Sequence, residues 1–264
     1  MNCKKYLSFF ILSLIIISCK SEDNTQVDED GIITGLQTKT LTHDNVNRNY
    51  LVYIPDSYDS EIDYPLMFVF HGFGGIATQF INNADMRDLA ESNNFIVVYP
   101  QGLDLGGTGS HWNCSNPSAD NKSDVDDIGF IENLIDQLIL DYPVIDSKRI
   151  YAAGYSNGGF MSYYLACNSK KFAAIGSVAG TMLDDSYQSC NANFPTAMIN
   201  IHGTNDFDVP YDGNTYYPSI PEVVDWWKNF NNTPNEDLLT NQDGSIEQYK
   251  YCLLYTSDAA DDRY

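Results

Sequence analysis

The sequence has 264 residues, and its 43% hydrophobic and 13% aromatic content is enough to form one sizeable core without a second domain. Fourteen basic residues stand against 36 acidic ones, which gives a formal net charge of −22. Such an acidic surface repels polyanions, so a nucleic-acid partner is not expected and a neutral substrate fits better.

Residues 1–18 have the organisation of an export signal, in which Lys4 and Lys5 precede an apolar run that is too short to span a bilayer. The run ends at Cys19, in a segment that resembles the lipobox of bacterial lipoproteins. We therefore expect Cys19 to be a lipid anchor on an outer-membrane or cell-surface protein that meets the membrane only through this anchor. Residues 19–31 form an acidic tether in this interpretation. An ordinary signal peptide with an incidental cysteine is the alternative.

From residue 32 onward, short apolar strands alternate with helical segments. Helices are expected at Ala84–Ser92, Asp126–Leu140, Gly158–Ala166 and Pro221–Phe230. Strands are expected at Ile32–Leu41, Asn49–Ile54, Pro65–Phe70, Phe95–Tyr99, Arg149–Ala153, Phe172–Val178 and Thr196–Ile201. This alternation predicts one α/β domain over residues 32–251, with a doubly wound, mostly parallel sheet and helices on both faces.

The segment Gly154-Tyr155-Ser156-Asn157-Gly158 matches the pattern G-x-S-x-G. The pattern alone is weak, but here a predicted strand runs into it and a predicted helix follows it. That context is typical of a nucleophile elbow, a sharp turn that holds a serine hydroxyl at the start of a helix. The sequence therefore predicts Ser156 as a nucleophile.

A glycine-rich segment, His71-Gly72-Phe73-Gly74-Gly75, directly follows the strand that ends at Phe70. Hydrolases with a nucleophile elbow place one donor of the oxyanion hole in such a loop. We expect the backbone amide of Phe73 to be the first donor and the amide of Asn157 to be the second.

A candidate acid follows the strand Thr196–Ile201, in the sequence His202-Gly203-Thr204-Asn205-Asp206. The order of serine and then acid along the chain is that of α/β hydrolases, in which the acid orients a catalytic histidine. Asp206 is the predicted acid, and Asp208 on the same loop is the alternative.

These segments together resemble the polyhydroxybutyrate depolymerase and feruloyl esterase group, which is carbohydrate esterase family one and its relatives. The resemblance implies the α/β-hydrolase fold and a serine esterase that hydrolyses a plant polysaccharide ester or a polyester through an acyl-enzyme, without cofactor or metal. It also suggests Trp112 as a wall of the substrate pocket, although Trp112 could equally pack on its own loop. The segments that carry the resemblance are Phe68–Gly75, Val125–Phe130, Arg149–Phe160, Ala174–Gly180 and His202–Tyr211.

Export would permit disulfides among the cysteines that follow the anchor. Cys167 and Cys190 both fall just outside predicted regular elements, which favours a bond between them. Two free thiols are the alternative, and Cys114 and Cys252 stay unassigned.

The catalytic histidine is the missing component, because none of the four histidines follows Asp206. His43, His71 and His202 are expected to have structural roles, and His111 is a remote candidate for the general base. Residues Ser245–Tyr251 resemble the last strand of the family. Residues 252–264 resemble nothing in the family and are expected to be non-native, so the chain is interpreted as a fragment that lacks its histidine. The alternatives are a catalytically inactive glycan-binding lipoprotein and a serine peptidase of the same fold.

Overall fold

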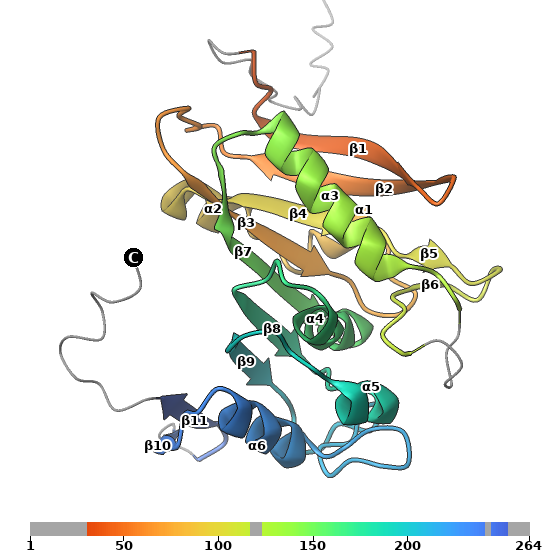
Figure 1. The fold of residues 1–264 in the computed structure, drawn as a ribbon, viewed down its shortest axis with the longest axis vertical. Helices are drawn as coiled ribbons and strands as arrows, with labels where there is room; N and C mark the ends of the chain where they lie inside the picture. Colours follow the sequence, from red (N-terminus) through yellow and green to blue (C-terminus); the bar gives the residue numbers. More distant parts are fainter. Residues whose placement is uncertain (1–30, 117–122, 241–243, 253–264) are drawn as a thin grey trace, which may run out of the picture.

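The computed structural model describes residues 31–116, 123–240 and 244–252. The expected signal, the anchor Cys19 and residues 253–264 lie outside these ranges. Seven strands form the central sheet in the order β1-β2-β4-β3-β7-β8-β9 (Figure 1). Strand β2 is antiparallel to both of its neighbours, and the remaining strands pair in parallel. The strands are β1 (Gly35–His43), β2 (Val46–Ile54), β3 (Tyr64–Phe70), β4 (Ile96–Pro100), β7 (Ile145–Tyr155), β8 (Ala174–Val178) and β9 (Ala197–Ile201).

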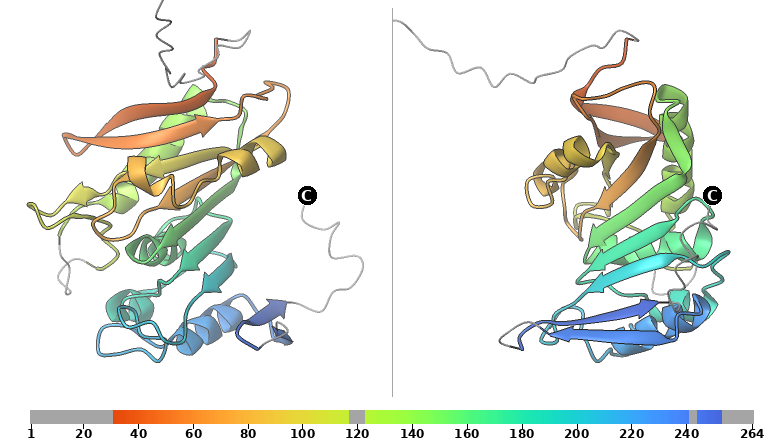
Figure 2. Two further views of the ribbon diagram at one scale, coloured as in Figure 1. Left: turned by 180° about the vertical axis from the view of Figure 1, so that it is seen from behind. Right: turned by 90° about the vertical axis from the view of Figure 1, so that its left-hand side faces the viewer.

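Helices cover both faces of the sheet, as expected (Figure 2). Helices α3 (Asp127–Asp141), α4 (Asn157–Asn168) and α6 (Ile220–Phe230) pack on one face and form the larger core with it. Helices α1 (Ala77–Phe80) and α2 (Arg87–Asn93) form a smaller core on the other face. Burial of these two apolar layers on either side of the sheet is the main force that holds a doubly wound domain together.

No helix among the described residues covers the second face over β8 and β9. Pairing between these strands places Val178 beside Ile201 and Gly176 beside Ile199 on the same side as the smaller core. Val178, Ile199 and Ile201 are between 41% and 59% exposed. Within the described residues, this part of the sheet therefore presents an apolar surface.

Cys167, in the last turn of α4, is joined by a disulfide to Cys190, which caps the C-terminus of α5 (Asp184–Ser189). The two Cα atoms lie 5.0 Å apart, within the range that a disulfide requires. This is the pairing that the sequence favoured. Cys114 is a buried free cysteine.

Five small elements in the structure had no counterpart in the sequence interpretation. They are α1, α5, the pair β5 (Leu103–Asp104) and β6 (Ser110–His111), and β10 (Asn235–Thr240). The strand expected near the C-terminus is present as β11 (Glu247–Cys252), but it pairs with β10 instead of with the central sheet. None of the helices in the described ranges has the length and apolar character needed to cross a bilayer.

Candidate active site

Ser156 lies between β7 and α4 with φ 51° and ψ −120°, a left-handed backbone conformation that is strained for a serine. The turn is tight because Gly154 and Gly158, which lack side chains, allow backbone segments to come into direct contact. A Cβ on Gly154 would lie 2.1 Å from the carbonyl oxygen of Gly158, and a Cβ on Gly158 would lie 2.2 Å from that of Phe70. The local structure is therefore that of a nucleophile elbow, with the serine at the N-terminus of a helix.

The glycine-rich loop after β3 lies directly against this turn. Parallel pairing of β3 and β7 sets Phe70 beside Gly154, so the loops after these two strands begin at the same end of the sheet. A Cβ on Gly72 would lie 3.4 Å from the Cβ of Ser156. The amide of Phe73, the first predicted oxyanion donor, is one residue farther along this loop.

Asn157 occupies the first position of α4, and its backbone N–H has no hydrogen-bond acceptor within the described residues. A free amide at a helix N-terminus can stabilise a developing negative charge. The side chain of Asn157 is engaged elsewhere. Its Oδ1 accepts from the backbone N–H of Trp112 at 2.7 Å, and its Nδ2 donates to the carbonyl of Trp112 at 3.0 Å.

The structure revises the expectation that Trp112 lines the substrate pocket. Its side chain is 1% exposed and packs edge-on against Phe70 at 5.1 Å. The indole N–H donates to the carbonyl of His71 at 3.0 Å. Because an aromatic residue with a neighbouring polar motif looks the same in sequence whether it is buried or exposed, Trp112 was ambiguous. It connects the elbow to the glycine-rich loop and offers no ring face to a ligand.

Asp206 lies on the loop after β9, where the sequence placed the acid. Its Oδ1 accepts hydrogen bonds from the backbone amides of Asp208 at 3.0 Å and Val209 at 2.9 Å. Its Oδ2 lies 3.7 Å from Nε2 of His202, and the side chain is 20% exposed. The carboxylate is thus held in place by its own loop, whereas Asp208 is exposed and contributes a backbone donor to that arrangement.

Two histidines support loop backbones at the site. His71 is fully buried, and its Nδ1 donates to the carbonyl of Gly72 at 2.7 Å while its Nε2 accepts from the amide of Gly102 at 3.0 Å. Burial lowers the pKa of His71, so its imidazole is neutral near neutral pH. His202 donates from Nε2 to the carbonyl of Val209 at 2.8 Å, and so closes the loop that carries Asp206.

The other two histidines, His111 and His43, also make contacts that do not involve Ser156. His111 is 3% exposed, and its Nε2 lies 3.2 Å from the hydroxyl of Ser123. His43 lies at the end of β1, against α3. Among the described residues, no side chain makes a hydrogen bond to the hydroxyl of Ser156. The turn at Ser156, the loop after β3 and the loop after β9 all follow the carboxyl ends of parallel strands of one sheet. None of the four described histidines makes a hydrogen bond to the serine.

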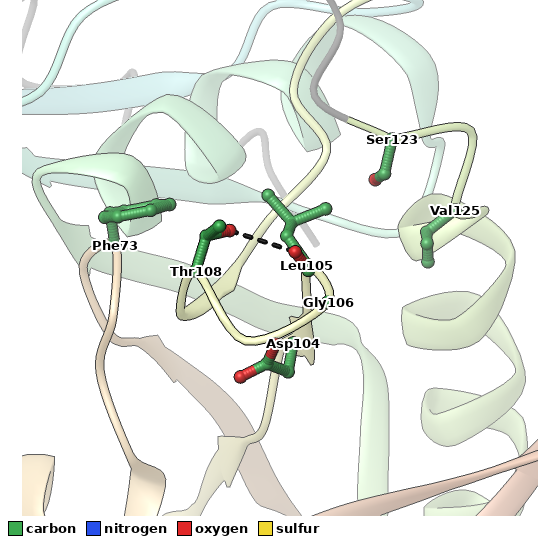
Figure 3. Close-up of a pocket in the computed structure, with 7 residues that line it drawn as sticks. All are labelled: Phe73, Asp104, Leu105, Gly106, Thr108, Ser123 and Val125. Carbon is green, nitrogen blue, oxygen red and sulfur yellow. Dashed lines mark hydrogen bonds between the residues drawn. The ribbon is translucent and has the colours of Figure 1, made fainter.

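A cavity of about 680 Å³ opens beside the predicted oxyanion donor Phe73 (Figure 3). Its volume is within the range typical of small-molecule sites. Phe73 is 48% exposed, and its ring faces the loop that contains Leu105 and Thr108. Sequence reasoning missed this wall because it belongs to a short glycine-rich loop without periodicity. The residues that line the cavity are Phe73, Asp104, Leu105, Gly106, Thr108, Ser123 and Val125.

The sheet order, the covering helices and the elbow are those of an α/β hydrolase. The chain belongs to the esterase family described as "Putative esterase", whose model matches residues 43–255. It is 31% identical over 173 residues to feruloyl esterase C of Emericella nidulans, a match that covers 63% of this chain and 57% of that protein. It is 29% identical over 182 residues to feruloyl esterase D of Neurospora crassa, covering 64% and 57% respectively. The chain thus spans less than two thirds of the length of these relatives.

Among solved structures, an acetyl xylan esterase from Aspergillus awamori matches 81% of this chain and 91% of its own length, with a TM-score of 0.60. The identity is 18%, so this likeness establishes the fold alone. Together with the sequence relatives, it confirms the expected α/β-hydrolase fold and the resemblance to the feruloyl esterase group.

Proposed function

We propose that this protein is a serine esterase that hydrolyses feruloyl or acetyl esters of plant polysaccharides, with Ser156 as the nucleophile. The observation that carries the proposal is the strained turn at Ser156, enclosed by Gly154 and Gly158 and placed against Gly72. Gly154 is in backbone contact with Gly158, and Gly158 is in backbone contact with Phe70 of β3. Membership of the esterase family supports the same assignment.

In the proposed reaction, the oxygen of Ser156 forms a bond to the acyl carbon while its proton passes to a general base. The amides of Phe73 and Asn157 stabilise the oxyanion, and each contributes about 3 kcal/mol if it acts as such donors do in other hydrolases. The ester bond then breaks, and the alcohol leaves with the proton. Water releases the acid in a second, equivalent step.

The base in this proposal is a histidine oriented by Asp206, and it is not one of the four described histidines. His71 and His202 support loop backbones, His111 is buried beside Ser123, and His43 contacts α3. We therefore propose that a natural continuation beyond residue 252 supplies it. The 264-residue chain should then be nearly inactive, since a serine without a base is a weak nucleophile.

The cavity beside Phe73 supports an acyl group with apolar and polar parts. Phe73, Leu105 and Val125 provide apolar walls, while Asp104 and Thr108 provide polar groups. A hydroxycinnamoyl group, which has an aromatic ring with a phenolic hydroxyl, matches this lining. The names of the sequence relatives point to feruloyl esters as well.

The test is hydrolysis of methyl ferulate and p-nitrophenyl acetate by the chain extended through its natural continuation. We expect turnover of both esters and little turnover of a peptide p-nitroanilide, which a serine peptidase would cleave. Ser156→Ala should lose most of the rate, and Asp206→Ala should lose more than Asp208→Ala. Unchanged turnover in Ser156→Ala would show that the site is assigned to the wrong residue.

The 264-residue chain provides the matched comparison. Turnover at ordinary enzyme rates by this chain, abolished by His111→Ala, would make His111 the base. Absence of ester turnover by the extended chain, with retained binding of an arabinoxylan oligosaccharide, would favour the glycan-binding alternative.

Lipid attachment at Cys19 is a separate part of the proposal, supported by the sequence that surrounds it. Metabolic labelling with a palmitate analogue in a bacterial host should label the protein. Labelling that persists in Cys19→Ser would exclude this anchor.

A further inference from the structure

Three side chains that the proposed reaction does not use come together where the β1–β2 hairpin meets the N-terminus of α3. Nε2 of His43 lies 3.6 Å from Oδ2 of Asp44 and 3.4 Å from Oδ2 of Asp126. The candidate ligand atoms of all three residues lie within 4.8 Å of one another. An imidazole nitrogen and two carboxylates form a donor set that suits Zn²⁺ and similar divalent transition metals.

The imidazole is directed at the carboxylates by its surroundings. The His43 side chain is 10% exposed, so nine tenths of it is buried, and its ring packs beside Phe130. Nδ1 is hydrogen-bonded to Nδ2 of Asn133 at 2.9 Å. Nε2 is buried and has no hydrogen-bond partner within the described residues. A buried ring nitrogen without a hydrogen bond is costly unless it finds a charge or an ion.

The carboxylates of Asp44 and Asp126 each keep an oxygen that can bind a further ligand. Asp126 is the N-cap of α3 and uses only Oδ1, which accepts from the amide of Gly129 at 2.8 Å. Gly129 is necessary to this arrangement, because a Cβ there would lie 2.1 Å from Oδ2 of Asp126 and 3.0 Å from the His43 ring. Asp44 lies in the hairpin turn with φ 50°, and its side chain is 73% exposed.

We propose that His43, Asp44 and Asp126 form a binding site for a divalent transition-metal ion of the Zn²⁺ class, with water completing the coordination. Ligands held about 2.1 Å from a tetrahedral ion are separated from each other by roughly 3.4 Å. The distances of 3.4 and 3.6 Å from Nε2 to the two carboxylates match this separation. The net charge of −22 adds a long-range attraction for cations.

Metal binding requires a lone pair on Nε2, so the ring proton must reside on Nδ1. The amide of Asn133, which is exposed, can turn to present Oδ1 as an acceptor for that proton. A hydrogen-bond acceptor behind a ligating histidine is the usual arrangement in metal sites. The ion would connect the β1–β2 hairpin to α3 and leave Ser156 and its loops untouched.

The test is calorimetric titration of the metal-free 264-residue protein with zinc chloride at pH 7.5, with thermal unfolding followed in parallel. We expect one ion per chain and a rise in the unfolding temperature. His43→Gln, Asp44→Asn and Asp126→Asn should each weaken zinc binding at least tenfold. Asparagine keeps the left-handed turn at position 44 and the cap at position 126, so these two variants should fold normally. Asp88→Asn on α2 is the control for loss of one exposed carboxylate, and it should bind as the parent does.

A second variant tests the role of Asn133. Asn133→Asp places a carboxylate behind Nδ1 and should tighten zinc binding about tenfold, as carboxylate–histidine pairs do. Gln137→Glu, one helical turn along α3, adds the same charge without reaching the ring and should have a much smaller effect. Absence of zinc binding, or equal binding in His43→Gln, would overturn the proposal.

Discussion

The side-chain amide of Asn157 pairs with both backbone groups of Trp112, accepting from its N–H at 2.7 Å and donating to its carbonyl at 3.0 Å. This contact holds the loop before α3 against the elbow. Asn157→Ala would remove the acceptor of the Trp112 N–H and one of the two donors to the Trp112 carbonyl, the other being Sγ of Cys114 at 3.3 Å. It should therefore lower the free energy of unfolding by about 1–3 kcal/mol. Urea denaturation measures the change.

Asn157→Asp is informative because it keeps an acceptor for the N–H of Trp112 but places a charged oxygen against the carbonyl. It should be no more stable than Asn157→Ala. Asn93→Ala on the exposed side of α2 serves as the control and should change stability by less than about 0.5 kcal/mol. If Asn157→Ala were as stable as this control, the paired contact would not hold the loop.

The glycines of the elbow should not tolerate even one added carbon. Gly154→Ala and Gly158→Ala would each place a Cβ closer than 2.3 Å to a backbone carbonyl oxygen, and backbone cannot move aside as a side chain can. Each should lower the free energy of unfolding by more than about 3 kcal/mol or prevent folding. Gly203→Ala is the matched control, because nothing lies within 4 Å of its Cβ position. Circular dichroism and thermal unfolding would separate the two outcomes.

Arg48 and Asp127 form an ion pair at 2.6 Å in which each side chain is 1% exposed. Asp127 also accepts from the backbone amide of Asn113 at 2.7 Å. Arg48→Met or Asp127→Asn would leave one buried charge unpaired, so each should cost about 3–5 kcal/mol. The exposed pair between Arg87 and Asp85 is the control, and Arg87→Met should cost less than about 1 kcal/mol. Similar losses at the two pairs would mean that burial does not distinguish them.

His71 should make stability depend on pH below neutrality. Burial lowers its pKa in the folded state, whereas the unfolded chain takes up this proton near pH 6.5. The contribution is therefore fully present above about pH 6.5 and is lost as the pH falls towards the folded-state pKa. The free energy of unfolding should fall more steeply between pH 7.5 and 5.5 in the parent than in His71→Asn. Equal slopes would show that His71 does not titrate differently on folding.

The central strands β3 and β4 were predictable from the sequence because they are buried along most of their length and therefore form continuous apolar runs. The segment Pro65–Phe70 and the segment Phe95–Tyr99 lie within one residue of β3 and β4 at their limits. The short elements were missed because two-residue strands such as β5 have no periodicity to detect. β11 was predicted as a strand, but its partner depends on β10, whose residues Asn235–Thr240 are mostly exposed and polar enough to resemble a loop.

In the candidate site, too, the residues with a local sequence signal were predicted and those that depend on distant contacts were not. Ser156, Phe73, Asn157 and Asp206 lie on turns that the sequence marked with glycine and with adjacent strands, so chain order was enough to place them at one edge of the sheet. The burial of Trp112 was not predictable, because it depends on a contact with Asn157, 45 residues away. The cavity was missed for a similar reason, since it forms only when the loop of Leu105 folds beside Phe73.

The net charge of −22 opposes association of molecules through the apolar surface of Val178, Ile199 and Ile201. Mutual repulsion between molecules keeps such surfaces apart at low ionic strength, but its range contracts to about 8 Å in physiological salt. Added salt should therefore favour self-association of the 264-residue chain through this apolar surface. Light scattering during purification should rise with sodium chloride, and dilute buffers are the conditions in which the monomer is best kept.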